Sequence, residues 1–317
     1  INMFLLYQII ISLILIISPF IIIFRILKNK EDKKRFIEKF SFFTQKRFSG
    51  KLVWFHGASV GEILSVIPLI KYYDKQKSVK QILVTSSTLS SSKVLKKFKF
   101  KKTIHQFYPI DHFFLTKKFL KYWKPNICIF IDSEIWPQMF TYINKSKIPL
   151  VLLNGRITKK TFNRWKKLKN FSEEVFNKIT IAFPQNNETQ IYLKKLNYKK
   201  TKFIGNLKFA ENKIETNLNK KLNSKFKQKK IWVASSTHEN EEIFCAKAHI
   251  SLKKKIKNLV TVIIPRHVHR SDLIISDIKN LGLNVVSHTP KNQNFKDMDV
   301  YIVNTFGETN KFHKIAS

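Results

Sequence analysis

The sequence predicts an α/β protein with two doubly wound, parallel-sheet domains, the second incomplete, preceded by an N-terminal transmembrane helix. Three observations support this prediction. The chain has 317 residues, which is more than a single hydrophobic core usually serves. Apolar runs of four to six residues alternate with helical segments along most of the chain, as is typical of strands buried in a parallel sheet. The first 24 residues contain no charged side chain.

Residues 1–28 are expected to form a membrane anchor. The uncharged run is long enough to cross the hydrocarbon layer as a helix, and Pro19 can be tolerated there as a kink. A basic start and a small-residue cleavage site, which mark a cleaved signal peptide, are absent from this run. Lys and Arg follow the run and none precedes it. The positive-inside rule therefore predicts a single-pass protein with its remaining residues in the cytoplasm.

Residues 29–210 are expected to form the first domain. Its basic, Phe-containing start at 31–49 is expected either to lie on the membrane or to pack under the domain. Strands are predicted at 52–56, 81–85, 103–108, 127–131, 149–153 and 179–183, and helices from 62, near 91–98, near 113–123 and from 137.

Residues 211–317 are expected to form the second domain. It opens with a charged, helix-prone stretch at 211–230. Strands are predicted at 231–234, 259–264, 284–287 and 300–303, with helices near 239–257 and 271–281. About four strands are too few to close a doubly wound domain comfortably, so we expect a small domain or a fragment.

The formal net charge of +38 raises the question of a nucleic-acid partner. The basic residues are spread along the whole chain, so the charge only weakly supports an acidic partner, either anionic lipid or a phosphorylated substrate. Cys128 and Cys245 lie far apart in apolar surroundings, which fits a reducing compartment. No metal site is predicted, because His267 and His269 have no third ligand at a suitable spacing.

The stretch 52–70 reads as an apolar strand, a small-residue turn and an apolar helix. Gly57 and Gly61 let the backbone bend and let a ligand approach it closely. Amides of the first helical turn favour negative charge, so Glu62 is expected to be held ionised at the crest of the sheet. There it can act as a general base. The alternative is that Glu62 only caps the helix.

Other polar clusters also follow predicted strands, at the end where parallel sheets bind ligands. The hydroxyls at 85–88 suit a phosphate or sugar loop, or a helix cap. Asp132 and Glu134 can hold a cation or orient a hydroxyl, or they form an acidic helix start before Pro137. In the second half, Arg266 offers a planar guanidinium that suits phosphate.

Taken in order, these clusters resemble the signature blocks of the 3-deoxy-D-manno-octulosonic acid (Kdo) transferases over nearly the whole chain. The matching blocks are 56–62, 85–88, 108–111, 132–137, 154–156, Gln185 with Glu188, 205–209, 236–239, 265–267 and 307–308.

The resemblance implies a GT-B glycosyltransferase, with two Rossmann-like domains facing a cleft. Such an enzyme moves Kdo from CMP-Kdo to the lipid A precursor at the inner face of the inner membrane, without a metal or other cofactor. By this likeness Glu62 is the base that deprotonates the acceptor hydroxyl, which attacks with inversion, and Glu134 assists. The other implied roles are acceptor binding by Ser59, Gly61, Thr85, Thr88 and Arg156, and donor binding by Asn206, Lys208, Ser236, Thr237, His238, Arg266, His267, Gly307 and Glu308.

The sequence departs from the family pattern in three ways, one of which is that Ser87, Ser90 and Ser91 replace a more varied Thr/Gly pattern. Asp132 stands where family members more often have Glu, and the family continues beyond the 307–308 block with further nucleotide-binding loops. The chain is thus expected to be C-terminally truncated and to bind the donor poorly by itself. Two alternatives stay open: a GT-B enzyme for another nucleotide sugar, and a membrane-tethered nucleic-acid-binding protein. The second would need a basic, aromatic-lined groove or a reading motif, and we find neither in the sequence.

Overall fold

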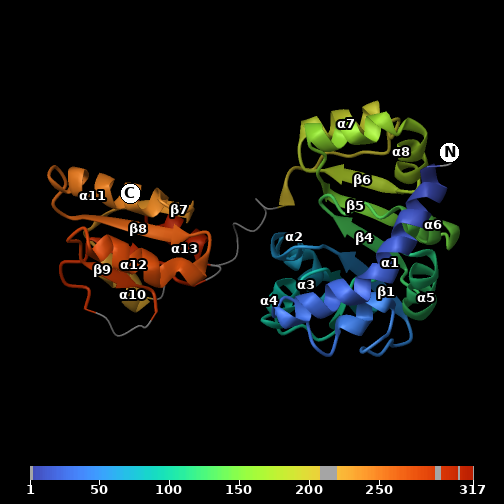
Figure 1. Cartoon of the computed structure of the whole chain (residues 1–317), viewed down its shortest axis with the longest axis horizontal. Coiled ribbons are helices and arrows are strands. Elements are labelled where there is room, and N and C mark those ends of the chain that lie inside the picture. The colour runs from blue at the N-terminus through green and yellow to red at the C-terminus, as the bar shows by residue number, and fades with distance from the viewer. Residues whose placement is uncertain (1–2, 208–219, 290–293, 306–307, 317) are drawn as a thin grey trace. The chain divides into compact units, whose positions relative to one another are not determined.

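The computed structural model describes residues 3–207, 220–289, 294–305 and 308–316. Contacts between residues divide the chain into two compact units, Ile1–Asn212 and Lys213–Ser317. Each unit has its own parallel sheet with helices packed against it (Figure 1).

The first unit contains a six-stranded parallel sheet in the order β3-β2-β1-β4-β5-β6. Apolar side chains occupy both faces of the central strands, as the unbroken apolar runs predict. The strands are β1 (Lys51–His56), β2 (Val79–Ser86), β3 (Thr103–Phe107), β4 (Ile127–Ile131), β5 (Leu150–Gly155) and β6 (Ile181–Pro184).

Helices cover both faces of this sheet. Trp54 of β1 belongs to the core cluster on one face, with Phe119 and Phe176. Phe55, the next residue of β1, belongs to the cluster on the other face, with Ile67. This alternation confirms a doubly wound sheet. The helices are α2 (Val60–Ser65), α3 (Ile67–Lys75), α4 (Leu89–Lys96), α5 (Phe113–Trp123), α6 (Pro137–Lys145), α7 (Lys159–Lys167), α8 (Lys169–Phe176) and α9 (Asn187–Lys195).

The last three of these helices were not predicted from the sequence. In α7, basic and polar side chains flank Phe162 and Trp165 and obscure the apolar repeat. The helix is stabilised by tertiary packing that the sequence repeat does not reveal. Phe162 stacks on Tyr192 of α9, with ring centroids 4.5 Å apart.

The strand order defines a switch point between β1 and β4. From β1 the chain winds through β2 to β3 on one side, and from β4 it winds through β5 to β6 on the other. In such sheets the crevice beyond the carboxyl ends of the two central strands binds ligands. Since β1 ends at His56 and β4 at Ile131, the loops that follow them lie side by side at this crevice.

The segment that precedes β1 packs on the first unit, which decides between the two expectations for residues 31–49. Its 3-10 helix, η1 (Phe36–Phe40), carries the buried Glu38, which accepts a hydrogen bond of 2.7 Å from the amide of Phe107. Phe43 stacks on Tyr122 of α5, with ring centroids 3.8 Å apart. These contacts make the segment part of the folded unit.

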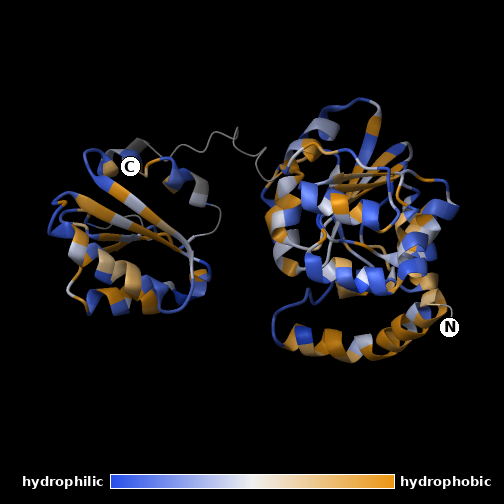
Figure 2. Cartoon of the chain, turned by 90° about the horizontal axis from the view of Figure 1, so that it is seen from above, coloured by the Kyte–Doolittle hydropathy of each residue, from blue (hydrophilic) through white to orange (hydrophobic). Residues whose placement is uncertain are grey.

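An apolar helix, α1 (Met3–Leu27), precedes this segment and is long and apolar enough to cross a membrane. It lies along one side of the first unit, and most of its ribbon has the colour of hydrophobic residues (Figure 2). Many of its large apolar side chains are exposed. The predicted apolar helix is confirmed, and its single-pass orientation stays a prediction.

The described residues of the second unit form a four-stranded parallel sheet in the order β7-β8-β10-β9. Helices α11 and α12 pack on one face and α10 and α13 on the other. The elements are α10 (Lys220–Phe226), β7 (Lys230–Thr237), α11 (Glu241–Lys253), β8 (Leu259–Pro265), η3 (Val268–Arg270), α12 (Ser271–Lys279), β9 (Val285–Ser287), β10 (Val300–Ile302) and α13 (Thr309–His313).

Candidate active site

Glu62 lies in the first turn of α2, directly after the loop that leaves β1. Ser59 is the N-cap of this helix, and its hydroxyl accepts a hydrogen bond from the Glu62 amide (3.3 Å) and donates one to Glu62 Oε1 (2.8 Å). The amide of Ala58 donates to Glu62 Oε2 at 2.7 Å. Glu62 therefore takes part in capping, and each carboxylate oxygen still has a lone pair for another donor.

The environment raises the pKa of Glu62 above its usual value. Burial is the largest cause; the hydrogen bonds from Ser59 and Ala58 act in the opposite direction, and the negative charges of Glu134 and Asp132 add to the rise of this pKa. The amide of Ala58 favours the ionised form of Glu62, as expected, although burial outweighs it in the direction of the pKa shift. A carboxylate with a raised pKa accepts a proton more readily near neutral pH.

The two glycines of this loop have different roles. A Cβ at Gly57 would lie 3.0 Å from Glu62 Cβ and 3.3 Å from Ile63 Cδ1, so a larger residue would have to displace these side chains by a few tenths of an ångström. A Cβ at Gly61 would meet nothing within 4 Å. Neither glycine has a positive φ. Close packing at Gly57 and open surface at Gly61, rather than a left-handed backbone, therefore explain them.

Glu134 lies in the loop after β4 and is held through a chain of hydrogen bonds. Its Oε2 atom accepts from His56 Nε2 at 3.1 Å and from Trp136 Nε1 at 2.9 Å. On the other side of the ring, His56 Nδ1 lies 2.9 Å from Thr85 Oγ1, which accepts from Trp54 Nε1 at 2.9 Å. An ionised carboxylate only accepts, so we assign a proton to Nε2 of His56.

The pKa of Glu134 shifts in the direction opposite to that of Glu62. Burial by itself would raise the pKa of Glu134, but the hydrogen bonds from His56 and Trp136 and the electrostatic interaction with His56 outweigh it and lower this pKa. Two neighbouring carboxyl groups with pKa values driven apart can divide the work of a reaction. The directions of the two shifts make Glu62 the better proton acceptor of the pair and favour the ionised form of Glu134.

The structure assigns the other predicted residues of the first unit to several roles. Thr85 is buried and supports His56, so it does not face an acceptor as the resemblance implied. Thr88 is the N-cap of α4 and accepts from the Ser91 amide at 3.2 Å, which is the helix-cap alternative. Arg156 is exposed, and its amide donates to the Asp132 carbonyl at 3.2 Å. Its side chain thus lies on a loop bonded to the Glu134 loop.

Predicted donor residues gather at the carboxyl ends of β7 and β8 in the second unit. His238 and His267 come from these two strand ends, and their ring centroids are 6.2 Å apart. The Arg266 amide donates to the Thr237 carbonyl at 2.9 Å, and the Arg266 side chain is exposed. Ser236 is exposed, with a φ of 60°. These residues form an open polar surface on one edge of the sheet.

Thr237 is the exception in this group. It is buried, and its hydroxyl donates to Glu242 Oε1 at 3.0 Å, so it stabilises the start of α11 instead of facing a donor. Glu242 also pairs with the guanidinium of Arg270 at 3.2 Å. Arg266 and Arg270 are close in sequence but differ in their surroundings. The Arg270 guanidinium is used in this ion pair, whereas the exposed Arg266 guanidinium forms no ion pair with the residues that the structure describes.

The remaining donor predictions are less well placed. Asn206 is half-buried in the segment after α9, and Glu308 is the N-cap of α13 and pairs with Lys311 at 2.9 Å. Lys208 and Gly307 lie outside the described residues. Within the described ranges, no group of three His, Cys, Asp or Glu side chains is arranged to hold a metal ion.

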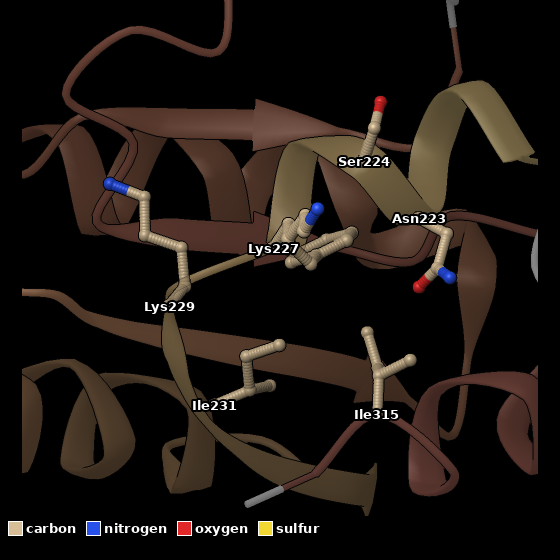
Figure 3. A pocket seen from close by; sticks show the side chains of 7 residues that line it. Asn223, Ser224, Lys227, Lys229, Ile231 and Ile315 are labelled. Carbon is tan, nitrogen blue, oxygen red and sulfur yellow. The ribbon is translucent and has the colours of Figure 1, made fainter.

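A pocket of about 550 Å³ in the second unit lies away from these residues (Figure 3). Lys229 and Ile231, at the amino end of β7, and Ile315 line it. The predicted donor residues occupy the opposite end of the same strand. This pocket is therefore separate from the candidate site.

The family model described as 3-deoxy-D-manno-octulosonic-acid transferase matches residues 34–211. A 3-deoxy-D-manno-octulosonic acid transferase of Rickettsia bellii is 35% identical over 312 residues, which cover 96% of this chain and 74% of that protein. The chain belongs to the Kdo transferase family. The signature blocks that carried the resemblance in the sequence thus identified the family correctly.

Two other relatives show how much of a family member the chain covers. The transferase of Rickettsia felis is 34% identical over 85% of this chain and 58% of its own length. That of Haemophilus influenzae is 26% identical over 94% of this chain and 72% of its own length. The match thus extends over part of each relative and leaves the rest of that relative without a counterpart here.

Solved structures support the fold. A putative UDP-N-acetylglucosamine 2-epimerase from Listeria monocytogenes matches 84% of this chain and 73% of its own with a TM-score of 0.60 and 10% identity. The S. aureus MnaA-UDP co-structure matches 84% of this chain and 72% of its own with a TM-score of 0.54 and 14% identity. At such low identity the likeness shows the fold alone, which is of GT-B type.

Proposed function

We propose that the protein transfers Kdo from CMP-Kdo to the lipid A precursor, lipid IVA, with inversion and with Glu62 as the general base. The observation that carries the proposal is the pair of carboxyl groups beyond β1 and β4. Both lie at the switch point of the sheet, one with a raised pKa and one with a lowered pKa. Membership of the family supplies the class of reaction.

In the proposed step, Glu62 takes the proton of an acceptor sugar hydroxyl while the oxygen attacks the anomeric carbon of Kdo. The new bond joins this carbon to the acceptor oxygen, and the bond to the cytidylate phosphate oxygen breaks. A single displacement inverts the configuration. Glu134, held by His56 and Trp136, orients the acceptor and favours the positive charge that develops on the sugar.

The donor side of the proposal rests on the second unit. Arg266 is exposed beside His267, and its planar guanidinium suits the phosphate of a cytidylate leaving group. Stabilisation by this cation and by helix N-termini needs no metal or other cofactor. The proposed partners are CMP-Kdo, lipid A precursor and the anionic lipid of the inner membrane, to which α1 attaches the cytoplasmic units.

The test is to incubate the whole protein, in vesicles, with CMP-Kdo and a tetraacylated lipid A precursor and to weigh the product. The expected gain is the mass of one or more Kdo residues. Transfer from a UDP-sugar but not from CMP-Kdo would favour the other GT-B alternative. Steep, salt-sensitive binding of DNA or RNA without any sugar transfer would favour the nucleic-acid-binding alternative.

A further inference from the structure

The two faces of α1 differ in what they touch. Its outer face consists of exposed apolar side chains, among them Leu5, Ile9, Leu13, Ile16, Phe20, Phe24 and Leu27, and it is broadened by the flanking Ile10, Ile14, Ile17, Ile21 and Ile23. Those named first recur every three or four residues, as one stripe of a helix does. The polar side chains Gln8, Ser12 and Ser18 lie off this stripe and are less exposed. The side of α1 directed at the protein thus carries these polar side chains together with apolar ones such as Phe4 and Ile22.

The N-terminal end of α1 is held by a buried carboxylate of the first unit. The Tyr7 hydroxyl donates to Asp111 Oδ2 at 2.6 Å, and Asp111 is only 2% exposed. The same carboxylate accepts from the amides of Gln138 (2.9 Å) and Met139 (2.8 Å) in the first turn of α6. In addition, Gln8 Nε2 donates to Gln138 Oε1 at 3.0 Å.

The other end of α1 is held by a second carboxylate of the same unit. Arg25 Nε lies 3.0 Å from Glu31 Oε2, and Lys39 Nζ lies 2.6 Å from that atom. Glu31 is 3% exposed. Lys39 belongs to η1, and its carbonyl accepts from the Ile110 amide at 2.9 Å, which joins this anchor point to the loop of Asp111.

These two attachments are incompatible with a helix that crosses a bilayer. Tyr7 and Arg25 are 18 residues apart in a helix, and thus separated by about 27 Å along its axis. That distance is close to the roughly 30 Å of a hydrocarbon layer. If α1 crossed the membrane, Tyr7 would lie near the far side, while Asp111 and Gln138 belong to a folded unit with a charged surface.

We propose that α1 lies in the plane of one lipid leaflet, with its outer face among the acyl chains and both ends held by the first unit. Figures 1 and 2 show the helix running along this unit and not projecting from it. An in-plane helix buries one apolar face at the boundary of headgroups and acyl chains. Lys28, Lys30, Lys33 and Lys34 follow directly and suit anionic headgroups.

This orientation has a consequence for the candidate site. The end of α1 that carries Tyr7 is bonded to the first turn of α6, and Trp136, the N-cap of α6, donates to Glu134. The leaflet surface is thereby brought beside the loop that carries Glu134. A lipid acceptor can reach this loop without leaving its leaflet. The orientation itself does not depend on the proposed function.

The decisive measurement is the depth of three nitroxide labels on the outer face, attached one at a time to the variants Ile9→Cys, Ile16→Cys and Phe24→Cys. The whole protein is used, in vesicles with anionic lipid, after Cys128 and Cys245 have been replaced by alanine. Depth follows from the relative accessibility of each label to oxygen and to a water-soluble nickel complex.

We expect three equal depths, because the labelled positions share one face of an in-plane helix. A crossing helix would place the label at Ile16 deeper than the other two by about 10–12 Å, from seven or eight residues at 1.5 Å each. Such a profile, or three labels in water, overturns the proposal.

A cross-link provides a second, independent measurement. The variant pair Gln8→Cys with Gln138→Cys should be joined within one chain by a short bis-maleimide in intact membranes, because these side chains touch. The matched pair Ile16→Cys with Gln138→Cys should not be joined, since Ile16 is 69% exposed on the outer face. Failure of the first pair to react in folded, membrane-bound protein also overturns the proposal.

Discussion

Replacing Glu62 by glutamine tests the proposed base with the smallest structural change. The amide oxygen can keep the hydrogen bond from the Ala58 amide, now 2.7 Å long. The Ser59 hydroxyl, which now donates to the carboxylate at 2.8 Å, can rotate and accept from the new amide group. Both contacts survive, so we expect the free energy of unfolding to fall by less than about 1 kcal/mol.

Activity should respond very differently. A glutamine cannot accept the proton of the acceptor hydroxyl, and a positioned general base contributes roughly 10²–10⁴-fold to the rate. This corresponds to a rise of about 3–5 kcal/mol in the activation free energy of transfer. The assay is kcat for transfer to the lipid acceptor at saturating CMP-Kdo, together with the thermal midpoint of the same sample.

Ser59→Ala is the matched control. It removes the N-cap and one hydrogen bond to the carboxylate, so it should cost about 1 kcal/mol of stability and less than tenfold in kcat. If Glu62→Gln keeps kcat within tenfold of the native value, or lowers the thermal midpoint more than Ser59→Ala does, Glu62 is a structural cap and the proposed mechanism is wrong.

The pH dependence follows from the same site. Protonated Glu62 cannot accept a proton, so kcat should fall as the pH drops through the pKa of Glu62, which burial raises above its usual value. The hydrogen bond from Ser59 lowers this pKa. Ser59→Ala should therefore move the acid limb to higher pH, while Glu62→Gln should have no such limb. An acid limb that stays in place in Ser59→Ala would contradict this assignment.

Three further substitutions test other parts of the site. Gly61→Ala should fold at least as well as the native protein, because its Cβ meets nothing within 4 Å and alanine favours helix by up to about 1 kcal/mol, but it should raise KM for the acceptor. Gly57→Ala should instead lower kcat, because its Cβ would lie 3.0 Å from the Cβ of the proposed base. Equal kinetics in the two variants would refute this distinction between the glycines. Arg266→Lys should raise KM for CMP-Kdo about tenfold and leave the thermal midpoint unchanged, since a lysine cannot form two parallel hydrogen bonds to phosphate. Arg270→Lys should instead destabilise the protein by roughly 1–3 kcal/mol, because the guanidinium of Arg270 forms a partly buried ion pair with Glu242. His56→Asn should lower kcat about tenfold, a rise of about 1.4 kcal/mol in the activation free energy, because it removes the donor to Glu134. In His56→Gln the amide nitrogen can reach the position of Nε2, so this variant should restore most of the lost kcat. Equal kcat in these two variants would argue against a positioning role for His56.

The sequence by itself determined the class of fold and the family. Alternation of apolar runs with helical segments is a local property, and it sufficed to place β1 and β4 and the polar loops that follow them. The order of the signature blocks then identified the family. Glu62 and Glu134 could be named as candidates because each follows a strand end directly.

Only the tertiary structure decided how these residues are held, because burial and hydrogen-bond partners depend on residues distant in sequence. His56 and Glu134 are 78 positions apart, and their bond helps lower the pKa of Glu134 while burial raises that of Glu62. Tyr7 and Asp111 are 104 positions apart. Their bond holds the N-terminal end of an apolar helix against the first unit. No local pattern contains such contacts, since hydrophobic periodicity records which face of an element is buried and not what lies against it.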